Sequence, residues 1–149
     1  MAIPSKLKQK VGRGTRPVRF EVEKGQIRRF AQAIGEENPI HSDEKSAKDA
    51  GFSSLVAPPT FLAALGDMEP LLDELDLDSQ SVMHAEEEYE YFRPVCAGDV
   101  IDVTHTLVNA YDKQAPNGRL VFVVIETRGI DSRSRDVFKG RRVLVELRN

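Results

Sequence analysis

The sequence predicts an α+β fold of a single domain, in which an antiparallel sheet is wrapped around a long central helix. A short strand and several helices come first, one helix is apolar over most of its surface, and four strand-like segments follow. This order favours antiparallel strands packed on the buried helix. The length of 149 residues suits one domain, and 40% hydrophobic with 30% charged residues is typical of globular proteins.

The first elements are a strand over about residues 17–23 and an amphipathic helix over 24–34. The apolar residues of this helix recur at the spacing of one helical face, which predicts a stripe facing the core. They are Ile27, Phe30, Ala31 and Ile34. Gly35 follows as a left-handed stop. A short second helix is expected over about 43–50, capped by Ser42.

The predicted central helix covers residues 55–75. Its beginning contains Pro58 and Pro59, and proline suits a first helical turn but cannot continue a helix backwards. Apolar residues then cover more than one side of the helix, which is typical of a buried helix. They are Phe61, Leu62, Ala64, Leu65, Met68, Leu71 and Leu72. Pro70 marks a place where the helix could kink or end.

Four strand-like segments complete the chain. They span about residues 82–92, 100–110, 119–130 and 137–147. The pair Asn117-Gly118 predicts a tight hairpin between the second and third of them. The continuous apolar run 120–125 suits a central strand that is buried on both faces. One face and one edge of such a sheet stay poorly covered in a single copy, so self-association is expected.

Composition argues against several classes of function. A net charge of −3 gives no nucleic-acid signature, and no segment approaches the ~20 apolar residues of a membrane span. Cys96 is the single cysteine, so no internal disulfide can form, and with no apolar leader a cytoplasmic protein is expected. The three histidines lie too far apart in sequence for metal-ligand spacing, so no metal site is expected.

The most informative segment reads Gly35-Glu36-Glu37-Asn38-Pro39-Ile40-His41 and lies between two predicted helices. Pro39 stiffens this loop, which can therefore hold a carboxylate and an imidazole near one another. An unperturbed imidazole titrates near pH ~6.5, and a positioned proton transfer contributes roughly 10²–10⁴ in rate. Glu36 and His41 are thus candidate general acid/base residues, although loop residues of these types are more often only solvated.

This segment resembles the G-D-x-N-P-x-H signature of MaoC-like (R)-specific enoyl-CoA hydratases and hydroxyacyl dehydratases. The segments Leu55–Phe61, Tyr91–Val95 and Gly98-Asp99 are also similar to that family. The resemblance covers about residues 17–147 and is closest to the N-terminal dehydratase-like subfamily. It implies a hotdog fold, assembled as a homodimer or as a heterodimer with another hotdog subunit, and it implies no metal or redox cofactor.

The resemblance also implies a hydro-lyase. The reaction would be the reversible hydration of trans-2-enoyl thioesters to (3R)-hydroxyacyl thioesters, carried on coenzyme A or acyl carrier protein. His41 matches the family histidine, Glu36 matches its aspartate and Asn38 matches the asparagine of the loop. The pair would activate a water that attacks C3, and the N–H of Thr60 would be the nearest donor to the enolate oxygen.

Two departures from the family leave other functions open. Glu36 is one methylene longer than aspartate, and Ala57-Pro58 stands where active members usually have His-Gly. That glycine N–H is the expected oxyanion donor, and proline has none. His41 favours a hydratase, whereas the proline pair favours a non-catalytic acyl-binding subunit that needs a hotdog partner. A hotdog acyl-CoA thioesterase is the third alternative.

Residues 1–16 form a basic N-terminal arm. Within residues 1–19 there are six cations and no acid: Lys6, Lys8, Lys10, Arg13, Arg16 and Arg19. One interpretation is a solvated tail. The other is an arm that attracts the phosphates of coenzyme A or an acidic carrier protein.

Overall fold

Five strands form one antiparallel sheet in the computed structural model of the chain, which describes residues 3–66 and 68–148. The strand order across the sheet is β1-β3-β4-β5-β2. The strands are β1 (Val18–Glu21), β2 (Met83–Tyr91), β3 (Val100–Ala115), β4 (Gly118–Asp131) and β5 (Asp136–Arg148). All of them lie where the sequence predicts strands, and β4, which holds the apolar run, is central. The predicted α+β class is confirmed.

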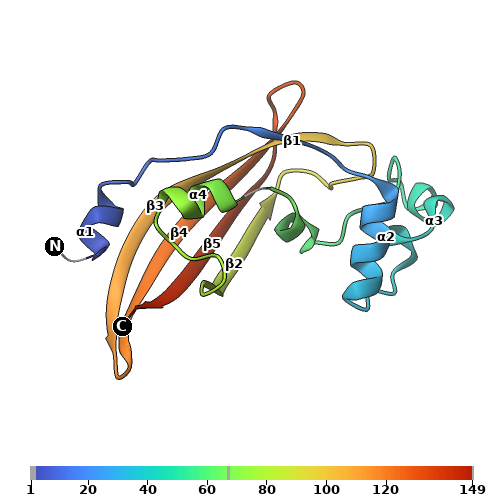
Figure 1. The fold of residues 1–149 in the computed structure, drawn as a ribbon. Helices are drawn as coiled ribbons and strands as arrows, with labels where there is room; N and C mark the ends of the chain where they lie inside the picture. The colour runs from blue at the N-terminus through green and yellow to red at the C-terminus, as the bar shows by residue number, and fades with distance from the viewer. Residues whose placement is uncertain (1–2, 67, 149) are drawn as a thin grey trace.

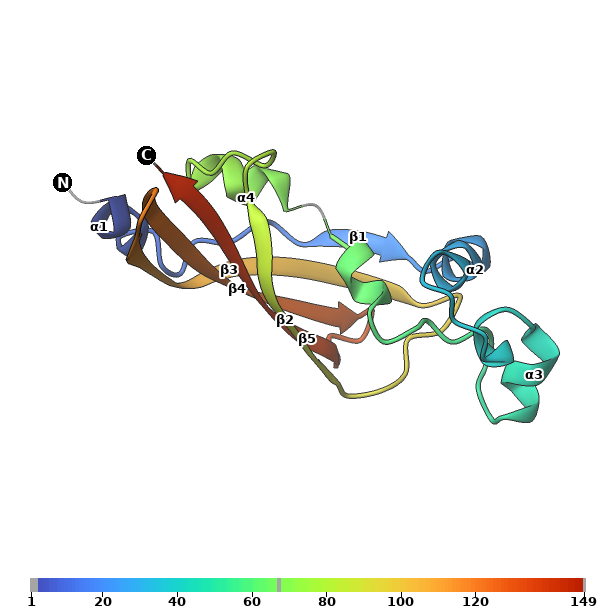
Figure 2. The same ribbon diagram turned by 90° about the horizontal axis from the view of Figure 1, so that it is seen from below.

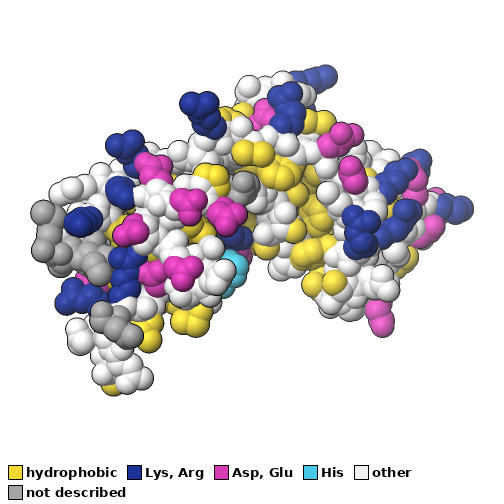
Figure 3. Space-filling model, in the orientation of Figure 1, with side chains coloured by type: hydrophobic (Ala, Val, Ile, Leu, Met, Phe, Trp, Pro, Cys, Tyr) yellow, Lys and Arg dark blue, Asp and Glu magenta, His cyan; other side chains and the backbone are white. Residues whose placement is uncertain are grey.

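The helices lie along one face of the sheet and beyond one of its ends (Figures 1 and 2). Beyond the end are α2 (Lys24–Ala33), η1 (Pro39–His41) and α3 (Glu44–Asp49). Over the face lie η2 (Phe61–Ala64) and α4 (Glu69–Glu74), and α1 (Ile3–Lys8) lies at the far end. No described helix covers the opposite face, where Glu126 and Arg128 are exposed. Figure 3 shows apolar side chains in the hollow between α4 and α2, so a single copy leaves apolar surface open.

Two core clusters join these elements to the sheet. The first packs α2 and η2 against one end of the sheet and includes Ile27, Leu55, Phe61, Ile101 and Phe138. The second lies under α4 and includes Leu71, Leu75, Leu107, Val123 and Ile125. Burial of such side chains is the main favourable contribution to folding. The first cluster also fixes the segment that precedes η2, and this segment carries the candidate site.

The continuous central helix predicted over residues 55–75 is wrong, because the chain forms the separate helices η2 and α4 there. Gly66 lies between them with φ +102°, in the left-handed region that interrupts a right-handed helix. A Cβ at Gly66 would lie 2.3 Å from Nε2 of the buried His105 ring. Pro70 lies in the first turn of α4, where its missing N–H is tolerated.

Two local predictions near the site also need correction. Ile34 was expected on the buried stripe of α2, but it follows the last helical residue and is 50% exposed. Ser42 was expected to cap the next helix, but Asp43 is the cap of α3. The Asp43 carboxylate accepts the N–H of Ser46 at 2.8 Å and its hydroxyl at 2.6 Å. Aspartate is among the strongest N-cap residues because its oxygen satisfies a free N–H of the first turn.

The basic arm packs on the sheet, so its interpretation as a solvated tail is wrong. Leu7 of α1 is buried in the second core cluster. After α1, the chain runs beside the edge of β3, where Gly14 forms a bridge with Thr106 and the N–H of Gly12 donates to Leu107 O at 2.8 Å. The arm thereby continues the edge that β1 begins and shields β3 from pairing with another chain.

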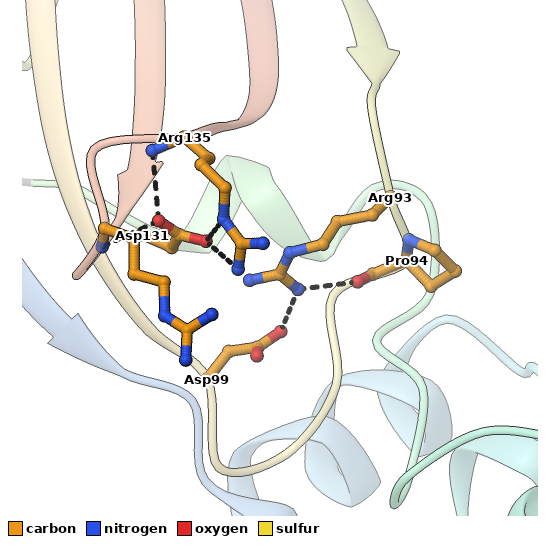
Figure 4. A network of polar contacts seen from close by, with 6 residues as sticks. Arg93, Pro94, Asp99, Asp131 and Arg135 are labelled. Carbon is orange, nitrogen blue, oxygen red and sulfur yellow. Dashed lines mark hydrogen bonds and ion pairs between the residues drawn. The ribbon is translucent and has the colours of Figure 1, made fainter.

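The loop between β4 and β5 is folded around the buried carboxylate of Asp131 (Figure 4). Its Oδ1 accepts the backbone N–H groups of Arg135 at 3.0 Å and Arg133 at 2.9 Å. Its Oδ2 accepts Nε–H of Arg135 at 2.9 Å. These hydrogen bonds, led by the backbone N–H of Arg135, lower the pKa of Asp131 to about 2.

We expect this carboxylate to make stability dependent on pH in the acid range. The folded pKa lies below the unfolded value of about 3.9, so its stabilisation is complete above that value and is lost as pH falls towards 2. Urea unfolding of wild type and Asp131→Asn should therefore differ most at neutral pH and converge between about pH 4 and 2. Asp112→Asn, which removes a partly exposed carboxylate paired with Arg119, is the control. A difference that stays constant through this window would contradict the assignment.

Candidate functional site

Glu36 leaves the end of α2 in a direction fixed by the backbone. Gly35 has φ +70° and donates to Gln32 O, while the N–H of Glu36 donates to Ala31 O at 2.9 Å. These two bonds form a Schellman motif. The Glu36 carboxylate is exposed and accepts the N–H of Asn38 at 2.9 Å. The loop therefore holds this carboxylate by its own backbone.

His41 ends the short helix η1 and is buried. Asn38 caps η1 by accepting the N–H of Ile40 at 3.2 Å, and Pro39 occupies its first turn. Nδ1 of His41 lies 2.6 Å from Val56 O. Because a carbonyl oxygen can only accept, Nδ1 carries the proton, and in the neutral ring Nε2 is the basic nitrogen. Among the described residues, no hydrogen bond to this Nε2 is found.

The segment before η2 connects the His41 loop to the sheet. The N–H of Val56 donates to Ile40 O at 3.0 Å, and the N–H of Ala57 donates to Val95 O at 2.8 Å. Val56 therefore bonds the His41 loop through both of its backbone groups. This carbonyl gave no signal in the sequence, because any residue type can supply it.

Thr60 stands at the beginning of η2 and is exposed. In the described part of the chain its N–H has no hydrogen-bond partner, whereas the N–H of Phe61 donates to Pro58 O at 2.9 Å. The hydroxyl of Tyr91 donates to Pro59 O, and burial raises the pKa of this hydroxyl, which keeps it protonated. Thr60 is thus the first residue of this turn with an N–H available to a ligand.

Two cavities flank the contact between Tyr91 and Pro59. We call the first the β2 groove; it has a volume of about 390 Å³. It is lined by Val56, Ala57, Pro59, Tyr91, Phe92, Arg93, Pro94 and Val95. The second, of about 340 Å³, is lined by Thr60, Ala63, His84, Ala85, Glu86, Glu87 and Tyr89.

The predicted site residues are brought together only in part. Thr60 lines the second cavity, and His41 is bonded to Val56, which lines the β2 groove. Neither Glu36 nor His41 is among the residues that line these two cavities.

Of the other two histidines, one lines the second cavity together with Thr60, and one is buried in the sheet. His84 is exposed beside the second cavity, and His105 is buried on β3, where its Nδ1 lies 2.8 Å from the Thr127 hydroxyl oxygen. Within residues 3–66 and 68–148, no group of three His, Cys, Asp or Glu side chains is placed to hold a metal ion. The helices of the same ranges include none long and apolar enough to cross a membrane.

Sequence comparison relates the chain to a dehydratase family. A family model described as "FAS1-like, dehydratase domain region" matches residues 9–139. A UPF0336 protein of Clavibacter michiganensis is 35% identical over 130 residues, which are 85% of this chain and 85% of that relative. The match therefore includes the His41 loop, the segment before η2 and the β2 groove.

Solved structures of dehydratases are similar in fold. A subunit of the HadBC (3R-hydroxyacyl-ACP dehydratase) complex of Mycobacterium tuberculosis superposes with a TM-score of 0.78 at 24% identity, over 91% of this chain and 96% of that one. A MaoC-like dehydratase of Rhodospirillum rubrum superposes with a TM-score of 0.67 at 25% identity, over 93% of each chain. Both similarities extend over nearly the whole chain.

Proposed function

Because the chain belongs to the family of FAS1-like dehydratase domain regions and has the hotdog fold of MaoC-like dehydratases, we propose that it is a hydro-lyase. It hydrates trans-2-enoyl thioesters reversibly to (3R)-hydroxyacyl thioesters, carried on coenzyme A or acyl carrier protein. The observation that carries this proposal is the 2.6 Å contact between His41 Nδ1 and Val56 O, which leaves Nε2 as the basic nitrogen.

In the proposed reaction, His41 Nε2 takes a proton from a water that Glu36 helps to orient. The water oxygen bonds to C3, and the electrons of the C2–C3 double bond move towards the thioester. The thioester carbonyl oxygen thereby becomes the negatively charged oxygen of an enolate. The N–H of Thr60 stabilises that oxygen. The proton taken from water is then delivered to C2, so the net reaction adds one water molecule across the C2–C3 double bond. Asn38 supports the step by holding the loop between Glu36 and His41.

A second hotdog subunit completes the site in this proposal. Neither Glu36 nor His41 lines the two cavities described above, and the edge strand β2 is exposed along most of its length. An exposed edge strand offers unpaired backbone groups to another chain. The partner is either a second copy or a different hotdog subunit, and it supplies the missing wall of the substrate pocket.

One group of observations favours a second candidate function, that of an acyl-binding subunit without its own chemistry. Pro58 and Pro59 have no N–H to donate, and the N–H of Phe61 is already bonded to Pro58 O. One oxygen of the Glu36 carboxylate, Oε1, already accepts the N–H of Asn38. Such a subunit would hold the acyl chain while a partner supplies the oxyanion donor.

A hydration assay with crotonyl-CoA separates these functions. We expect the purified chain alone to remove the absorbance of the enoyl thioester and to form the 3-hydroxy product. Thioester binding without turnover, with activity appearing only when a hotdog partner carrying His-Gly is added, would support the acyl-binding subunit instead. Release of free thiol would identify a thioesterase. Neither binding nor turnover, alone or with such a partner, would overturn both proposals.

A further inference from the structure

We propose that three arginines at one end of the β2 groove bind the phosphate of a phosphopantetheine thioester. This arginine cluster consists of Arg93, Arg133 and Arg135. The inference rests on the proposed function and deepens it, because it assigns the residues that recognise the carrier of the acyl group. Coenzyme A and acyl carrier protein both carry the acyl group on a pantetheine arm that ends in a phosphate ester. This phosphate ester is the group that the cluster would bind.

Arg93 joins the groove to the cluster. It lines the β2 groove, and its Nη1 donates to Asp99 Oδ2 at 2.7 Å and to Pro94 O at 3.0 Å. Among the described residues, no hydrogen bond is found for its Nε and Nη2. These two nitrogens form the kind of donor fork that suits phosphate and carboxylate groups.

Arg135 approaches Arg93 from the β4–β5 loop. Figure 4 shows the two guanidinium groups pointing toward one another. The strand register explains this approach, because Ile101 of β3 pairs with Asp131 and so brings the Asp99 turn beside the loop. Arg135 uses Nε and Nη2 on Asp131, which leaves Nη1 as a further donor. Each guanidinium group pairs with one carboxylate, Asp99 or Asp131, and the remaining donors of both are available to an added anion.

Arg133 adds a third positive charge. Its backbone N–H is bonded to Asp131, but its side chain is exposed and forms no ion pair in the described part of the chain. The cluster therefore has three guanidinium groups for the two carboxylates of Asp99 and Asp131, a net charge of +1. Neighbouring Arg128 is already paired with Asp136 and does not change this balance.

The chemistry of the groove agrees with a ligand of this kind. Most of its lining is apolar or aromatic, which suits a pantetheine arm and acyl chain, and its charged end lies at Arg93. The basic N-terminal arm is a weaker candidate for the phosphate. Lys10 and Arg13 of the arm are both engaged with Glu74 of α4.

The test is the binding of saturated thioesters, which the proposed hydratase cannot convert. Butyryl-CoA, a butyrylated carrier protein and butyryl-pantetheine, which has no phosphate, are compared by calorimetry. Arg133→Ala is the main variant because the exposed Arg133 side chain forms no ion pair in the described part of the chain, and Arg135→Gln is the second. Arg119→Ala removes the same charge at the opposite end of β4 and is the matched control.

We expect Arg133→Ala to weaken the binding of phosphate-bearing thioesters by roughly three- to tenfold and to leave the binding of butyryl-pantetheine unchanged. The carrier whose binding falls identifies the source of the phosphate. Equal weakening of butyryl-pantetheine, equal weakening by Arg119→Ala, or no weakening at all would overturn the inference. Binding is measured without turnover. If binding depends on the cluster but the chain hydrates no enoyl thioester, only the proposed function is refuted. Hydration with unchanged binding in Arg133→Ala refutes only the cluster.

Discussion

Replacing His41 by glutamine is expected to lower the rate of crotonyl-CoA hydration by about 10²–10⁴-fold, because the variant lacks the basic nitrogen. Glutamine is preferred to alanine because its amide can donate to Val56 O as the imidazole does. Alanine would leave this buried carbonyl unsatisfied, at a cost of about 1–3 kcal/mol. Turnover is measured from the loss of enoyl-thioester absorbance, and the urea midpoint confirms that the variant is folded.

The role of the Glu36 carboxylate can be tested by comparing Glu36→Gln with a control variant at the neighbouring residue, Glu37→Gln. Glu36→Gln keeps an oxygen that can accept the Asn38 N–H but removes the charge, so we expect hydration to fall by about 10²-fold or more. Glu37→Gln removes the neighbouring charge, to which the structure gives no hydrogen bond or ion pair among the described residues, and should change the rate little. Hydration that survives both His41→Gln and Glu36→Gln would refute their roles. An equal loss in Glu37→Gln would show that charge near the loop, not a positioned carboxylate, is what matters.

Much of the candidate loop could be predicted from local signals. Gly35 predicted the end of α2, and Asn38-Pro39 predicted the turn that became η1. The depth of His41 could not be predicted, because it depends on a backbone carbonyl 15 residues away. The arginine cluster was hidden for the same reason. Its members come from two loops that only the pairing of β3 with β4 brings together.

The strands were predictable because alternation and the turn signal of Asn117-Gly118 act over short ranges, although the two-residue hairpin loop is Pro116-Asn117 and Gly118 begins β4. The face each strand presents was harder to predict. Val143, Val145 and Leu147 recur at period two, yet Leu147 is exposed, and Leu144 of the alternate set packs in the core beneath α4. Both sets along β5 contain apolar residues, so the pattern did not decide which set faces the helices.

The break between η2 and α4 leads to the largest expected effect on stability. Gly66→Ala should lower the free energy of unfolding by about 2–5 kcal/mol. About 1–2 kcal/mol comes from placing a Cβ at a left-handed φ, and about 1–3 kcal/mol comes from overlap with the buried His105 ring. Helix propensity alone predicts the opposite sign, because alanine is the better helix former. A more stable variant with more helical circular dichroism would mean that the continuous helix over 55–75 is accessible.

Three further variants separate the backbone effect from the packing effect. Gly51 has φ +94° and open space where a Cβ would lie, so Gly51→Ala should show only the backbone cost of about 1–2 kcal/mol. In a His105→Ala background the overlap is removed, and Gly66→Ala should then cost about as much as Gly51→Ala does. Urea unfolding of wild type, Gly66→Ala, His105→Ala and the double variant gives the coupling between Gly66 and His105 directly. A coupling near zero would mean that the imidazole does not enforce the break, and that strain at Gly66 alone divides the helix.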